Sequence, residues 1–375
     1  MTVRWKPLIV LSGLFLVVAV LGLLAFVLVP PYGSDDVLPM ARAEWKAKKY
    51  DRALIQFQRA LQKDPKNAEI HEQVAAMYAD WAEAVPAKRG DLRARRLRSL
   101  ADAAKYGRQR AEPRRLLLAD ALRHDEWAES LHWARELVPL DAEAADAHYV
   151  LALDAIDAQP PRLAEARTHL EPLQKREPNR PRTVWVQAQV AEQTNDEAAL
   201  TDLLQISRSL PAADDADPVD RMALLRLRVL DARQPTEANT LAERIDAVRV
   251  EAERLAGDPE PVPGRVAGIG RLLDSLQDHL TKTAKTVPDD TNKATSDALE
   301  TIIGTVYGKA TDPAASPDPS TYQAYAEHLL TRQKREPCLD AIAKGLALPA
   351  AKRPAWTGAA MGLRELGVKA ALLDT

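Results

Sequence analysis

Residues 53–67, ALIQFQRALQKDPKN, decide the fold of this 375-residue chain. Ala53 and Ala60 lie about two helical turns apart, so they share one face of a helix and allow a second helix to approach closely. Phe57 lies between them on that face, where it fills the space between the two helices, and Pro65 ends the helix. A single helical hairpin cannot bury its apolar face, so this stretch predicts further hairpins stacked against it.

The same pattern of paired helices recurs along the chain. Apolar residues recur at helical spacing, as at Leu97, Leu100, Ala101 and Ala104, and alternating Val, Ile and Thr are almost absent after the N-terminus. An aromatic content of 5% suits helices that pack through small residues. The sequence therefore predicts an all-α protein with hairpins over residues 37–67, 68–106, 111–141, 145–178, 181–210 and 218–256.

Within residues 53–65, the pattern Ala-x3-Phe, a second Ala and then Asp-Pro resembles the second half of a tetratricopeptide repeat (TPR). The resemblance covers residues 37–210, is weaker over 218–256 and returns over 322–375, although the first helix of the first repeat lacks the usual Trp and Leu-Gly. It implies an α-solenoid of helical hairpins, wound into a right-handed superhelix. The concave face of such a superhelix is lined by the first helix of each pair and binds a peptide or helix of a partner protein.

The N-terminus carries an apolar run. Residues 8–29 contain no charge and only Ser12 as a polar side chain. This run is long enough for one transmembrane helix. A cleaved signal peptide is the alternative, but its apolar core is typically about 7–15 residues. Arg4 and Lys6 precede the run and acidic residues follow it, so the N-terminus is expected in the cytoplasm and the repeats in the periplasm. The chain is thus predicted to be a single-pass protein of the bacterial cytoplasmic membrane, bound to the membrane through this N-terminal helix.

These features divide the chain into six segments. The predicted segments are a cytoplasmic N-terminus (1–7), a transmembrane helix (8–29), a linker (30–36), a TPR-like solenoid (37–256), a Pro/Gly-rich linker (257–264) and a C-terminal helical region with a further TPR-like repeat (265–375).

The resemblance also implies which residues line the groove. Groove-facing positions of the first helices in the third, fourth and fifth repeats match Arg115, Leu122, Tyr149, Leu153, Ile156, Arg182, Trp185 and Gln189. Apolar residues in the centre with an arginine at each end would suit a peptide or helix that has apolar anchors and an acidic group. The alternative is that Tyr149 and Trp185 only pack against the next repeat.

A basic stretch is the second candidate surface. Residues 88–115 hold eleven Lys or Arg side chains against three acidic ones, in a chain whose net charge is −3. The candidate patch consists of Arg89, Arg93, Arg96, Arg108 and Arg110. It could contact anionic lipid or an acidic partner, whereas nucleic acid is disfavoured by the predicted compartment and by the absence of interleaved aromatic residues. The alternative is a solvated helix face paired with acidic neighbours.

No catalytic, cofactor or metal site is predicted. His71-Glu72 lacks the second histidine of a zinc-protease motif, and the glycines at 264, 268 and 270 lack the Lys-Ser/Thr of a phosphate-binding loop. Cys338 is the only cysteine, so no internal disulfide can form, and a buried packing thiol is expected.

The expected function is therefore that of a scaffold and not of an enzyme. The sequence predicts a membrane-anchored TPR adaptor that binds a partner peptide or helix in its groove and assembles an envelope complex. The alternative is an auxiliary or regulatory subunit of a membrane-associated biosynthetic, maturation or export enzyme complex.

Overall fold

The computed structural model describes residues 34–210, 217–235, 238–257, 262–283, 289–312, 319–348 and 357–371. Within these ranges the chain forms helices and short turns and no strand, which confirms the predicted all-α class. The predicted transmembrane helix at 8–29 lies outside the described residues. None of the described helices combines the length and the apolar character that crossing a bilayer would require.

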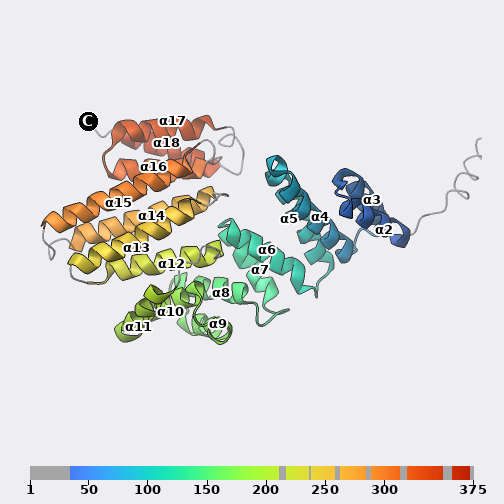
Figure 1. Cartoon of the computed structure of the whole chain (residues 1–375), viewed down its shortest axis with the longest axis horizontal. Coiled ribbons are helices and arrows are strands. Elements are labelled where there is room, and N and C mark those ends of the chain that lie inside the picture. Colours follow the sequence, from blue (N-terminus) through green and yellow to red (C-terminus); the bar gives the residue numbers. More distant parts are fainter. Residues whose placement is uncertain are drawn as a thin grey trace, which may run out of the picture. The chain divides into compact units, whose positions relative to one another are not determined.

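The chain divides into two compact units, Met1–Pro113 and Arg114–Thr375. From residue 34 on, the first unit contains two helical hairpins, in which α2 packs on α3 and α4 packs on α5, and a short 3-10 turn, Pro86–Lys88 (Figure 1). Its helices are α2 (Ser34–Lys46), α3 (Tyr50–Lys63), α4 (Ala68–Ala84) and α5 (Arg89–Tyr106).

Small residues bring the first hairpin together as predicted. Ala53, Phe57 and Ala60 are completely buried on the inner face of α3. They belong to an apolar core that also contains Ile70 and Met77 of α4, so the two hairpins share one core. Burial of such side chains stabilises the unit by about 1.5–3 kcal/mol for each large apolar group.

The second unit is also built from paired helices. Its first helix, α6, begins just before the boundary between the units. The helices are α6 (Ala111–Arg123), α7 (Trp127–Leu137), α8 (Ala145–Asp157), α9 (Leu163–Arg176), α10 (Pro181–Gln193), α11 (Glu197–Ser209), α12 (Pro218–Arg233), α13 (Ala238–Ala256), α14 (Pro263–Thr283), α15 (Asp289–Ala310), α16 (Pro319–Thr331), α17 (Arg335–Ala347) and α18 (Thr357–Ala371).

From α8 onward, each first helix of a pair contacts its own partner and the first helix of the next pair. Thus α8 contacts α9 and α10, α12 contacts α13 and α14, and α14 contacts α15 and α16 (Figure 1). This nearest-neighbour packing defines a helical solenoid. The described residues of the second unit are thus an array of stacked helical hairpins, as the sequence predicts.

Two local contacts show how tightly the later repeats pack. A Cβ atom at Gly270 would lie 2.3 Å from Cζ of Tyr307, so only glycine allows α14 to approach α15 this closely. Cys338 is completely buried and its thiol donates to the carbonyl of Ala326, which confirms the expected packing role.

Candidate protein-interaction surface

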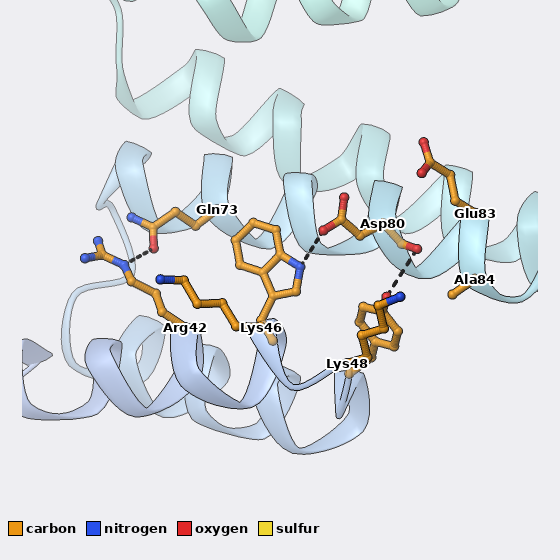
Figure 2. A pocket seen from close by; sticks show the side chains of 9 residues that line it. Arg42, Lys46, Lys48, Gln73, Asp80, Glu83 and Ala84 are labelled. Carbon is orange, nitrogen blue, oxygen red and sulfur yellow. Dashed lines mark hydrogen bonds between the residues drawn. The ribbon is translucent and has the colours of Figure 1, made fainter.

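An open pocket of about 700 Å³ lies in the first unit between α2 and α4, the first helices of its two hairpins (Figure 2). Solenoids of stacked helical hairpins use extended concave surfaces for binding. The lining residues are Arg42, Trp45, Lys46, Lys48, Tyr50, Gln73, Asp80, Glu83 and Ala84.

A tight turn shapes one end of the pocket. α2 ends at Lys46 and α3 begins at Tyr50, and Lys48 between them has a φ of 57°, in the left-handed region. The chain therefore reverses sharply, and the rings of Trp45 and Tyr50 both line the pocket from either side of the turn.

Hydrogen bonds connect the two walls of the pocket. The indole Nε1 of Trp45 donates to Oδ2 of Asp80 at 2.8 Å, and the hydroxyl of Tyr50 donates to the backbone carbonyl of Asp80 at 3.4 Å (Figure 2). At the other end, Nε of Arg42 donates to Oε1 of Gln73 at 2.9 Å (Figure 2). These bonds fix the orientation of side chains that are only partly covered by protein.

The two aromatic rings that line the pocket pack against further aromatic rings of the first unit. Trp45 meets Phe57 edge to face with ring centroids 6.3 Å apart, and Tyr50 stacks on Trp81 at 5.5 Å. Tyr78 stacks on the same Trp81 at 6.3 Å. Because large aromatic rings have few rotatable bonds, Trp45 and Tyr50 lose little conformational entropy when a partner covers them.

Charge differs between the two walls. Lys46 and Lys48 are exposed on one side and form no ion pair with any described residue, whereas Arg42 lies 3.5 Å from Glu69. On the α4 side Asp80 is engaged by Trp45, and Glu83 is exposed. The two lysines are therefore available to an acidic group that enters beside the aromatic rings.

The residues predicted from the TPR resemblance lie in the second unit and differ in burial. Arg115 is exposed and donates to Asp141 at 2.8 Å. Leu122, Trp185 and Gln189 are half-buried. Four others are buried: Tyr149, Leu153, Ile156 and Arg182. Their role in binding a partner stays a prediction, but only the first four offer surface to one.

Arg182 is the centre of a buried ionic network. Its side chain is 3% exposed and donates to Asp146 and, at 2.8 Å, to Glu177, and its Nε lies 3.8 Å from Asp220. Burial alone would lower the pKa of Arg182, but attraction by Asp146 and Asp220 outweighs it and raises the pKa above its ordinary value. Burial also raises the pKa of Asp220 despite the nearby guanidinium. The network joins α8, α10 and α12.

Side chains of later repeats cover the first-helix face beside Leu122 and Tyr149. Met222 and Arg226 of α12 line the same small cavity as these two residues, and its volume is only about 50 Å³. The guanidinium of Arg226 lies 5.9 Å above the ring of Trp185. Side chains of α12 thus occupy the space beside the predicted groove residues Leu122 and Tyr149.

The basic patch is partly engaged within the first unit. Arg89, Arg93 and Arg96 are half-buried on α5, and Arg108 and Arg110 are exposed. Arg110 forms a two-pronged ion pair with Glu72, with N–O distances of 2.6 and 2.7 Å. Whether the patch binds an anionic partner stays a prediction.

Sequence reasoning missed the pocket between α2 and α4, because the first helix of the first repeat lacks the usual TPR residues. A usable signal was present in Arg42, Trp45 and Lys46, whose i, i+3, i+4 spacing places an aromatic ring and two cations on one helix face. Across the described ranges, no group of three His, Cys, Asp or Glu side chains could hold a metal ion.

No protein-family model and no curated protein matches the sequence. Among solved structures, the crystal structure of PilW, a widely conserved type IV pilus biogenesis factor, is similar with a TM-score of 0.33 and 14% identity, over 61% of this chain and 96% of that one. The TPR domain of P58(IPK) is similar with a TM-score of 0.24 and 12% identity, over 91% of this chain and 98% of that one. Similarity at this level carries no argument about function.

Proposed function

We propose that this chain is a membrane-anchored TPR-like scaffold that binds a segment of a partner protein in the pocket between α2 and α4. In this role it assembles a protein complex of the cell envelope. The observation that carries the proposal is the open pocket itself, which has two ordered aromatic rings and two exposed lysines on its walls. Aromatic anchors beside complementary charges are typical of the residues that contribute most to binding energy.

The chemistry of the pocket specifies the kind of segment. An apolar side chain of the partner covers Trp45 and Tyr50, and an adjacent Asp or Glu reaches Lys46 or Lys48. Such a contact at the rim increases the association rate and the specificity more than the affinity.

Photo-crosslinking in native membranes tests this proposal. A photoreactive amino acid replaces Lys46 in the full chain, and the control places it at Gln58, which is exposed on α3 and outside the pocket. We expect a defined partner to be crosslinked only from position 46, and the adduct to be lost when Trp45→Ala is added. The same adducts from both positions, or none from position 46, would contradict the proposal. Adducts confined to one biosynthetic, maturation or export complex would make the chain an auxiliary subunit of that complex.

The anchor is the second part of the proposal. The uncharged run at 8–29 and the basic residues before it support a transmembrane helix with the repeats on the periplasmic side. We expect the full chain to stay in the membrane fraction after an alkaline carbonate wash. Release into the supernatant would instead indicate that the run is a processed export signal.

A further inference from the structure

A second pocket, of about 490 Å³, lies in the second unit where the end of α12 meets α14 and α16. Its lining is mostly charged or polar and includes four cationic side chains, Arg233, Arg271, Lys282 and Arg332. It shares no residue with the pocket in the first unit, so an inference about it is independent of the proposed scaffold function.

The acidic residues of this pocket are already engaged. The ring Nδ1 of His328 lies 2.6 Å from Oδ1 of Asp274. Arg332 is 3.7 Å from Asp278, and the amide of Gln323 donates to Glu327 at 3.0 Å. The carboxylates therefore oppose the entry of an anion less than their number suggests.

Three of the cations lack an acidic partner. Arg271 and Lys282 are exposed and make no ion pair with any described residue. Arg233 donates through Nη2 only to the hydroxyl of Ser275, at 2.6 Å, and its Nε is buried without a hydrogen-bond partner. A buried guanidinium N–H without an acceptor costs stability, so its presence beside an open pocket points to an acceptor supplied by a ligand.

We propose that this pocket binds a phosphate-bearing ligand, with Arg233, Arg271 and Lys282 as its cationic contacts. A phosphate monoester carries up to two negative charges and offers three acceptor oxygens, which matches three cations better than a single carboxylate does. Arginine forks donate to phosphate in pairs, and the exposed lysine adds a flexible point charge. The pocket is larger than one phosphate group, so it can also hold the group to which the phosphate is attached. A soluble phosphate ester and the headgroup of a phospholipid both present such a phosphate.

Calorimetric titration of the full chain in neutral detergent tests the site. The probes are glycerol 3-phosphate and a short-chain phosphatidic acid, with glycerol as the uncharged control. We expect saturable binding of at least one phosphate probe, weakened at least tenfold by Arg233→Gln or Arg271→Gln. Arg364→Gln, which removes an exposed arginine of α18, should leave the affinity unchanged. Tighter binding of phosphatidic acid would identify a lipid headgroup, and tighter binding of glycerol 3-phosphate a soluble ester.

Lys282→Gln is a further variant that should fold normally, because Lys282 is exposed and its replacement removes a charge without disturbing the core. Circular dichroism of each variant confirms native helix content. The absence of saturable binding to either probe would overturn the proposal, and so would full affinity in the folded Arg271→Gln/Lys282→Gln double variant.

Discussion

The two units differ in how much open space they leave beside the first helices of their hairpins. In the first, α2 and α4 leave an open pocket of about 700 Å³ between them. In the second, where α6, α8 and α12 converge, Met222 and Arg226 reduce the space beside Leu122 and Tyr149 to about 50 Å³. Both units are built from stacked hairpins, so the repeat plan alone does not create an open pocket. The side chains that later repeats extend across the first helices decide whether this space stays open.

The largest effect is expected from replacing Arg182, the centre of the buried ionic network in the second unit. Arg182→Met leaves Asp146, Glu177 and Asp220 without their shared guanidinium in a site where the arginine is 3% exposed. Breaking a buried pair by removal of one partner costs about 3–5 kcal/mol. We expect a loss of this size in the free energy of unfolding, measured by urea denaturation followed by circular dichroism.

A neighbouring arginine provides the matched control. The side chain of Arg180 is 45% exposed although it lies 3.4 Å from the same Asp220. Arg180→Met should therefore cost less than about 1 kcal/mol. Equal losses for the two variants would show that burial of Arg182 is not what makes the network important.

The open pocket responds to loss of its indole. Trp45→Ala removes the contact with Phe57 and the hydrogen bond to Asp80, so we expect a loss of about 2 kcal/mol, below the 3–5 kcal/mol typical of a fully buried ring. Crosslinking from position 46 should fall at least tenfold. Trp185→Ala in the second unit should leave this crosslink unchanged, and a reduced yield would support Trp185 as a groove residue.

Mutation can also enlarge the small cavity beside Leu122 and Tyr149 in the second unit. In the Met222→Ala/Arg226→Ala double variant the side chains that line the cavity with Leu122 and Tyr149 are shortened, at an expected cost of about 1–2 kcal/mol. We expect a several-fold rise in fluorescence of the apolar dye ANS. Met361→Ala is the control, because Met361 is 53% exposed on α18 and should not change dye binding. An unchanged signal in the double variant would mean that the groove is closed by the helices themselves.

The fold was predictable because its determinants are local. Ala53, Phe57 and Ala60 are close in sequence, and their spacing alone specifies one helix face that accepts a second helix. The same local information recurs in every hairpin, so stacking follows from the need to bury each apolar face. This is why the predicted hairpins at 37–67 and 111–141 coincide with α2 and α3 and with α6 and α7.

The burial of the predicted groove residues was not predictable from these local spacings. Arg182 was expected at the surface of the groove, but its partners Asp146 and Asp220 lie 36 and 38 residues away, and they turn it into a buried connection between repeats. The repeat pattern gives each residue a position on its own helix. It does not tell which side chain of a later repeat will cover that position, as Met222 and Arg226 do beside Tyr149.

The smallest expected effect is a pH dependence of the α8–α9 hairpin, which carries the buried Tyr149. His148 donates through Nε2 to the carbonyl of Ala142 at 2.9 Å, so its Nδ1 accepts from Nδ1 of His169 at 3.0 Å. Burial, and then the proximity of His148, lower the pKa of His169, while Glu165 opposes the shift and Arg162 adds to it.

The sign of the effect follows from this lowered pKa. The folded state accepts a proton on His169 less readily than the unfolded state does, so stability is complete above the ordinary value of about 6.5 and is lost as the pH falls below it. His169→Gln retains a donor for His148 but cannot titrate, and it should reduce the loss of stability between pH 7 and pH 5. Thermal unfolding of both proteins across this range measures the difference. Parallel pH profiles of the two proteins would exclude His169 as the titrating group.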